Sequence, residues 1–535
     1  MIKTALKNFR FHLNYYFEKQ IKCDYLKFLA IVRYFYRKNK GNLGFIFIIY
    51  IIGGGSLLLA NFNFIDDNDR TFSGIFGFDV WSRYLAGAFS GILQVNTNFL
   101  VPIFPYSLLV SFLFLSLSSL ILLKIIDKRL LDSKVAIITS SCVGLFPYFL
   151  ENLSYKFDSP FMALSVLCAI LPFAFLRLSK ISFFAISIIC LFCVLTTYQA
   201  SNGIYIILSI FLINKILQSK AKMGCFSAFS LFYSTALSYI SACIIFIFSV
   251  YKNIHTYASN EMLPIQYLII GTAKHLYKYY EIIFLDFYPT ALFQLMLAFG
   301  LIFVIKNTLD SKLNTFASFS LNILSLALML IFAFGIYIFL IMPLFFSRAF
   351  IGFGILITIL ALNSITLKPK RAKILSYFLS LILVEHIFVF ANFYGTSLIN
   401  HNEYESFRVK IVANDLANVL RSNDLNLDSK FNIPIYDNSG LSPFIINSRK
   451  HYPLIERIIP NSFSQTNYIE RYLLAKYGIF SDMNKNNCAK LVQNGAKVSL
   501  LVDNYYHKIE RINDNVNTCY KITLKPSFGI YSEFK

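Results

Sequence analysis

Long runs of apolar residues, separated by short polar segments, dominate the chain. A membrane-spanning helix needs roughly 17 to 25 such residues to cross a hydrocarbon core of about 30 Å. Eleven runs approach that length, although the third and sixth are short, and they predict a mainly α-helical polytopic membrane protein. The runs cover residues 43–60, 101–123, 135–150, 159–176, 181–198, 201–217, 226–250, 287–305, 316–340, 349–367 and 374–395.

The composition agrees with this pattern. Of 535 residues, 56% are hydrophobic and only 14% are charged, and the mean hydropathy is +0.59. One soluble core cannot bury so much apolar surface. The net charge of +21 would suggest a nucleic-acid partner in a soluble protein, but here the basic residues sort by membrane side. Membrane lipids, and no nucleic acid, are therefore the predicted surroundings.

The distribution of Lys and Arg gives an orientation. With the N-terminus inside, the inner loops hold 15 Lys or Arg in 42 residues, and the outer loops hold 7 in 102. Cytoplasmic loops carry such an excess of positive charge. The N-terminus is therefore predicted in the cytoplasm, and an odd number of spans then puts residues 396–535 outside.

Two polar regions flank the predicted spans. Residues 1–42 hold ten Lys or Arg and show no signal-peptide pattern. They are expected to form a cytoplasmic basic amphipathic helix that lies on anionic lipid, or else only a positively charged flank of the first span. Residues 396–535 alternate strand-like and helix-like stretches, which predicts a small soluble α/β domain. Cys488 and Cys519 are the two cysteines of this tail, and an oxidising compartment would favour a disulfide between them.

Polar side chains gather in the predicted outer loops. The first of these loops contains FIDDNDRTFSGIFGFDVWSRY and supplies Asp66, Asp67, Asp69, Arg70, Asp79, Trp81 and Arg83. Later loops add Glu151, Tyr155, Lys156, Asp158, Tyr198, Gln199 and Arg348. A charge held at membrane depth is expensive and usually functional, so this convergence predicts a site in a cavity that opens outward.

Acids and arginines on one rim suit the transfer of a sugar from a lipid phosphate. That reaction needs a carboxylate to take the proton of the attacking hydroxyl. It also needs cations on the departing phosphate, a task that fits the bidentate guanidinium fork. Asp66 and Asp67 are candidates for the first role and Arg70 for the second, while a solvated loop or a helix N-cap is the alternative for the two aspartates.

The string Asp67-Asn68-Asp69 also matches the DxD pattern that holds a divalent metal on nucleotide sugars. Nucleotide sugars lie in the cytosol, whereas this loop faces outward in the predicted topology. A lipid monophosphate leaving group can be neutralised by Arg or Lys alone. No metal or other cofactor is therefore assigned, and the sequence leaves a divalent cation open.

Glu385 is the exception to the rim pattern. It lies eleven residues into the last predicted span, about 16 Å deep at 1.5 Å per residue. It is expected to pair with a Lys or Tyr of another helix, or to line a groove for a lipid carrier. It also favours a transporter as the alternative, because transporters use buried acids as proton relays.

Four blocks in these loops resemble a known family. They are DDNDR, WSRYL, ENLSYKFDSPFMALSV and TTYQASNGIY. Together they resemble the type II serotype-converting glucosyltransferases, which modify the O-antigen of lipopolysaccharide in Gram-negative bacteria. The resemblance covers roughly residues 45–395 and is clearest between Glu151 and Met162.

The resemblance implies a GT-C class glycosyltransferase of the bacterial inner membrane. Its donor would be undecaprenyl-phosphate glucose and its acceptor a lipid-linked O-antigen unit on the periplasmic side, with a flippase and a donor-synthesising glucosyltransferase as partners. In that class the catalytic acid lies in the first outer loop, here Asp66 or Asp67. Substrate binding would fall to the other rim residues, namely Arg70, Trp81, Arg83, Glu151, Tyr155, Lys156, Asp158, Tyr198, Gln199 and Arg348.

Two other functions stay open at this point. A lipid-linked oligosaccharide flippase or transporter predicts charged residues in several spans and inverted repeats, of which the sequence offers Glu385 and no repeat. An O-antigen polymerase or ligase predicts arginines in large outer loops rather than an early acidic pair. The acidic pair therefore favours the glycosyltransferase.

Overall fold

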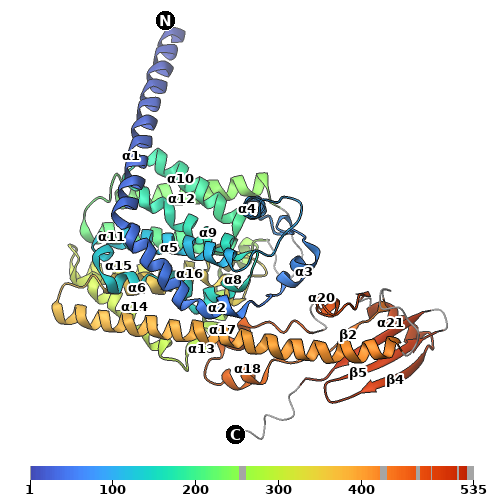
Figure 1. Cartoon of the computed structure of the whole chain (residues 1–535). Coiled ribbons are helices and arrows are strands. Elements are labelled where there is room, and N and C mark those ends of the chain that lie inside the picture. The colour runs from blue at the N-terminus through green and yellow to red at the C-terminus, as the bar shows by residue number, and fades with distance from the viewer. Residues whose placement is uncertain are drawn as a thin grey trace.

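A computed structural model of the chain describes residues 2–251, 261–421, 431–464, 470–482, 485–514 and 517–526. The protein is mainly helical, and two 52-residue helices are its longest elements, α1 (Ile2–Gly53) and α17 (Lys370–Arg421) (Figure 1). Helix α1 joins the predicted basic segment to the first apolar run without a break. Helix α17 likewise continues through residue 396, where the sequence predicted the last span to give way to a separate tail.

Shorter helices form the bundle between these two. Helix α5 packs against α1 and α9, α10 against α12, and α14 against α15. Their bounds are α2 (Gly55–Ala60), α3 (Asp66–Ser73), α4 (Tyr84–Gln94), α5 (Tyr106–Ile126), α6 (Lys134–Thr139), α7 (Cys142–Leu145), α8 (Pro147–Ser154), α9 (Ser159–Ile170), α10 (Lys180–Thr197), α11 (Asn202–Ser219), α12 (Ala228–Ser249), α13 (Leu268–Phe287), α14 (Ala291–Leu309), α15 (Thr315–Ile331) and α16 (Ile351–Ser364).

The apolar helices make this a membrane protein. In the described part of the chain, seven helices are long and apolar enough to cross a membrane, or eight if a pair bent by 57° counts as one span. The bent pair joins residues 134–145 to α8, which begins at Pro147, a residue without a backbone donor. Two further apolar segments, residues 159–175 and 351–364, are shorter. The total of eleven spans therefore stays a prediction.

The two ends of the bundle differ in chemistry. At one end of the bundle, helices α6, α10, α12 and α15 each begin with an N-cap side chain that accepts a hydrogen bond from a backbone N–H of the first turn. These N-caps are Ser133, Ser179, Ser227 and Asn314. The Lys- and Arg-rich loops 124–134, 177–180, 214–224, 306–315 and 368–373 lie at this end, which we call the basic end. The opposite end carries α3 and α4, and we call it the rim.

A six-stranded sheet lies beside the far end of α17 (Figure 1). The strand order is β3-β1-β6-β5-β4, with β2 paired to β6. Strands β4, β5 and β6 are antiparallel neighbours, and β1 runs parallel to β3 and β6. The bounds are β1 (Phe431–Asn432), β2 (Ile435–Tyr436), β3 (Ser481–Asp482), β4 (Lys497–Asp503), β5 (His507–Asn513) and β6 (Thr518–Leu524). Two short helices, α20 (Glu470–Ala475) and α21 (Lys485–Gln493), pack against the sheet. Two others, α18 (Pro443–Ser448) and α19 (Leu454–Ile458), pack against the bundle instead.

The second half of α17 ties the sheet to the bundle. Its apolar face, with Val412 and Leu416, shares a buried core with Ile509 and Ile522 of the sheet. Arg408 is fully buried beside this core, and its guanidinium donates to the carbonyls of three residues, Ser439 (2.8 Å), Tyr506 (2.8 Å) and Lys525 (2.7 Å). Carbonyl oxygens thus satisfy a charge that would otherwise be costly to bury.

Candidate active site

The two adjacent aspartates at the start of α3 occupy different environments. Asp67 is 0% exposed, and its Oδ2 accepts hydrogen bonds from the backbone N–H groups of Phe64 and Lys156, both at 3.0 Å. Asp66 is only half-buried. Successive residues on a helix point about 100° apart, so one carboxylate faces the protein while the other faces the rim surface.

Burial changes the proton affinity of the groups at this position. It raises the pKa of Asp67 to about 7, although the two backbone hydrogen bonds favour the charged form. Burial also lowers the pKa of Lys156 to about 8. The Lys156 Nζ donates to Asn63 Oδ1 at 2.6 Å and to the Asn61 carbonyl at 3.0 Å. Lys156 therefore fixes the first rim loop through both its backbone and its side chain.

Arg70 and Asp158 form an ion pair with little solvent exposure. The Arg70 guanidinium also lies 4.5 Å above the ring of Phe78. Burial disfavours the charge on Arg70, but the nearby carboxylates of Asp158, Asp66 and Asp67 outweigh it and raise the pKa of Arg70. The pair connects the first rim loop to the turn between α8 and α9.

Glu151 and Arg348 form a second pair on the rim. The Glu151 carboxylate accepts from the Arg348 side chain at 3.0 Å and from its backbone N–H at 2.8 Å. Arg348 also donates to the Tyr155 hydroxyl at 2.9 Å, and its carbonyl accepts from Tyr198 at 3.2 Å. The negative charge of Asp66 disfavours ionisation of Tyr155 and favours the charged form of Arg70. Asp66 is therefore close to Arg70 and to Tyr155, the partner of Arg348.

Arg83 and Gln199 form a third contact. Arg83 Nε donates to Gln199 Oε1 at 3.2 Å, while Gln199 Nε2 donates to the Trp81 carbonyl at 2.9 Å. The Arg83 guanidinium lies 4.8 Å from the ring centre of Tyr198. Since Tyr198 also contacts Arg348, the second and third clusters are continuous.

One cavity of about 210 Å³ opens between these clusters. Its polar wall contains Arg83, Gln199 and Arg348, and Trp81 lies beside them. The remaining lining is largely apolar and comes from residues such as Leu195, Phe246, Ile247, Ile336, Leu340 and Met342. The cavity therefore combines two guanidinium groups, an amide and an indole ring with a wall suited to a hydrocarbon chain.

A glycine at positive φ shapes the apolar wall of this cavity. Gly335 lies in the irregular helix η6 (Phe332–Phe339) with φ +57°, a conformation that glycine adopts at little cost. Asn202 Oδ1 accepts from the next backbone N–H, that of Ile336, at 3.0 Å and from Tyr239 at 2.8 Å. A Cβ on Gly335 would collide with Asn202. This fixed bend positions Ile336 and Tyr337 on the cavity wall.

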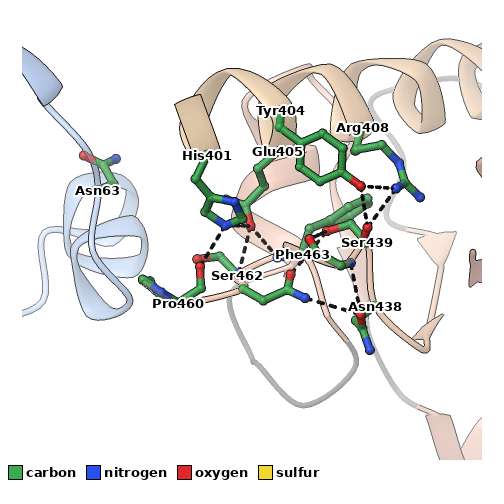
Figure 2. Close-up of polar contacts among 12 residues, drawn as sticks. Asn63, His401, Tyr404, Glu405, Arg408, Asn438, Ser439, Pro460, Ser462 and Phe463 are labelled. Carbon is green, nitrogen blue, oxygen red and sulfur yellow. Dashed lines mark hydrogen bonds and ion pairs between the residues drawn. The ribbon is translucent and has the colours of Figure 1, made fainter. Parts of the chain in front are cut away.

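A second cavity, of about 330 Å³, lies where the first rim loop meets α17 and α20. We call it the junction cavity, and its polar lining includes Asn61, Asn63, Asn68, Lys156, Asn402, Glu405 and Lys476. Figure 2 shows Asn63 on the loop and His401, Glu405 and Arg408 along α17. Glu405 accepts from the backbone N–H groups of Ser462 (2.8 Å) and Phe463 (2.9 Å), and His401 contacts the Pro460 carbonyl at 2.9 Å (Figure 2).

The DxD string does not present its two acids together. Asp67 faces the protein interior, whereas Asp69 accepts a hydrogen bond from Ser73 Oγ at 2.9 Å along α3. Residues two apart on a helix do not face each other. Among the described residues, no group of three His, Cys, Asp or Glu side chains could hold a metal ion.

Other predicted residues lie away from the rim. Glu385 is exposed on α17 and makes no hydrogen bond or ion pair with another described residue. Cys488 of α21 and Cys519 of β6 lie against each other, with Cα atoms 5.8 Å apart, a separation that suits a disulfide. The role of Glu385 as a carrier-groove residue stays a prediction.

Sequence reasoning missed several residues that line the two cavities. Tyr337 and Met342 lie inside or directly after a long apolar run, which concealed them among membrane-facing residues. Glu405 and Lys476 of the junction cavity belong to the predicted tail, where charged residues are ordinary. Their meeting with the first rim loop depends on the continuous helix α17.

The apolar helices and the charged rim define a membrane protein with a polar site at one end of its bundle. Comparison with known families adds the reaction class. Residues 55–397, more than half of the chain, match the family described as Glucosyl transferase GtrII, and the chain belongs to this family. The resemblance to type II glucosyltransferases is thereby confirmed. A search of curated proteins found no match, and neither did a search of solved structures.

Proposed function

We propose that this glucosyltransferase-family protein moves glucose from a polyprenyl phosphate, such as undecaprenyl phosphate, to a lipid-linked surface glycan. The proposal places the rim on the periplasmic side of a bacterial inner membrane, with eleven spans and a soluble periplasmic domain at residues 396–535. The excess of Lys and Arg at the basic end supports this orientation. A glycosyltransferase needs a sugar donor and an acceptor, and the two cavities at the rim offer a place for each.

The cavity of about 210 Å³ beside Arg83 and Arg348, which we call the rim cavity, carries the proposal, because its lining matches the three parts of such a donor. Arg83 and Arg348 suit the phosphate. Trp81 and Gln199 suit a sugar, since an indole ring packs on its apolar face and an amide bonds its hydroxyls. The apolar wall suits the first part of the polyprenyl chain. The polar junction cavity, next to Lys156, is the proposed site for the hydroxyl-rich acceptor.

In the proposed reaction Asp66 is the general base. The acceptor oxygen attacks the anomeric carbon and forms the new glycosidic bond with inversion, while the bond from that carbon to the phosphate oxygen breaks. Asp66 takes the hydroxyl proton, and the bonding electron pair leaves with the polyprenyl phosphate, which the arginines stabilise. Asp66 is favoured over Asp67 because Asp66 is only half-buried, whereas Asp67 is fully buried. Asp67 instead positions α3.

The test is glucose transfer by the purified protein from polyprenyl-phosphate glucose to a lipid-linked glycan. Asp66→Asn should lower kcat by about 10²- to 10⁴-fold, the usual contribution of a general base. The matched control is Asp69→Asn, which removes the same charge from the same helix and should keep most of the activity. Full transfer by Asp66→Asn would exclude Asp66 as the base, and absence of transfer by the wild-type protein with this donor would exclude the donor class.

A further inference from the structure

A cavity lined by both basic and apolar residues lies at the opposite end of the bundle from the rim. Its volume is about 680 Å³, and it opens between α1 and the loops at the basic end. Six basic side chains line it, namely Lys38, Lys124, Lys128, Arg177, Lys215 and Lys222. None of the six makes a hydrogen bond to a carboxylate of another described residue. This concentration of positive charge has no part in the proposed transfer reaction.

The cavity contains far more positive than negative charge. Asp127 is the one acid among its described lining residues, and Arg129 occupies that carboxylate with its backbone N–H (2.9 Å) and its guanidinium (2.6 Å). The positive charges of Lys128 and Arg177 repel the positive charge of Lys124. Like charges held together destabilise a fold unless an anion neutralises them. The cavity is therefore built to receive an anionic group.

The apolar part of the lining indicates what carries that anion. Ile31, Phe35, Ile125, Phe173 and Leu176 contribute hydrocarbon surface between the cations. The cavity also lies at the ends of α5 and α11, two helices apolar enough to span a membrane, and hence at the level of lipid headgroups. A soluble anion would need no such hydrocarbon surface, whereas an amphiphile would.

Helix α1 strengthens this assignment. Tyr25, Leu29, Val32 and Tyr36 follow a helical spacing of three and four residues, and all four are exposed, Tyr25 at 59% and Tyr36 at 60%. The neighbouring face is fixed to the bundle, since Asp24 accepts from Ser182 Oγ at 2.7 Å. An exposed apolar stripe beside basic residues is typical of a helix that lies in the membrane interface.

We propose that the basic cavity binds the phosphate headgroup of an anionic phospholipid from the leaflet at this end of the bundle, with α1 lying in the same interface. The site is independent of the glycosyl-transfer proposal, since it shares none of the rim residues. A bound lipid of this kind would anchor α1 to the bundle and neutralise the cluster of cations.

The test measures binding of phosphatidylglycerol and phosphatidylcholine to the purified full-length protein by native mass spectrometry. The wild-type protein should retain phosphatidylglycerol preferentially. Lys128→Gln/Arg177→Gln should weaken that binding by roughly thirtyfold, because each cation near a membrane surface contributes about 1 kcal/mol. The second pair, Lys38→Gln/Lys222→Gln, changes exposed residues on other walls of the cavity and should weaken binding similarly.

The matched control is Lys370→Gln/Arg371→Gln, which removes the same charge from exposed positions at the same end but outside the cavity. It should weaken binding by less than about threefold. Equal weakening by the control, equal retention of phosphatidylcholine, or no effect of either cavity pair would overturn the proposal. Displacement of the lipid by millimolar inorganic phosphate would also overturn it, because the site would then bind a free anion.

Discussion

Replacing Asp67 by asparagine is expected to stabilise the protein, and increasingly so toward neutral pH. The pKa of Asp67 is about 7 in the folded protein against an ordinary value of 3.8. Between these values the folded state holds a proton that the unfolded state has released, so the free energy of unfolding falls as the pH rises. The full difference between these two pKa values corresponds to about 4 kcal/mol. Asparagine avoids this cost, and its amide oxygen can still accept from Phe64 and Lys156.

The measurement is the unfolding free energy of wild type and Asp67→Asn in detergent from about pH 5 to about pH 7.5. The advantage of Asp67→Asn should grow by about 2 kcal/mol across this range. Using the difference between the two proteins removes the contribution of other titrating groups, such as Glu405. Asp69→Asn is the control and should show no such growth. A constant difference, or a variant less stable than wild type at pH 7.5, would refute the account of Asp67 as a buried carboxylate with a raised pKa.

Two further substitutions test the rim. Arg348→Gln should lower the unfolding free energy by roughly 2 kcal/mol, because the buried Glu151 carboxylate loses its charged hydrogen-bond partner; an unchanged unfolding midpoint in detergent would contradict this. Gly335→Ala should lower the unfolding free energy by about 1 to 3 kcal/mol, because alanine is strained at φ +57° and its Cβ collides with Asn202. The control is Gly300→Ala, which changes a helical position with open space around it. Equal stability of the two variants would argue against the fixed bend.

The mainly helical fold and the location of the polar site could be predicted from the sequence, because apolar runs and charged loops are visible in the order of the residues. The gathering of Trp81, Arg83, Gln199 and Arg348 at one cavity follows from the alternation of spans between two sides. The lengths of α1 and α17 could not be predicted in this way. Hydropathy marks where a helix leaves an apolar environment, but it does not mark whether the backbone stays helical beyond that point.

The ion pairs on the rim could not be predicted from the sequence either. Glu151 and Arg348 are 197 residues apart in the chain, and Arg70 and Asp158 are 88 apart. Their partners depend on how the helices pack, which no local pattern encodes. The different burial of Asp66 and Asp67 also needs the helix, since two identical neighbours in the sequence differ only in the direction in which α3 points them.

The most direct test of the central claim is the mass of the surface glycan repeat in cells with and without this protein. The account predicts one additional hexose per repeat with the wild-type protein and none with Asp66→Asn, at equal amounts of protein in the membrane. Asp69→Asn should restore the added hexose. An unchanged repeat mass with the wild-type protein, in cells that make both the donor and the acceptor, would contradict the account, as would full addition by Asp66→Asn.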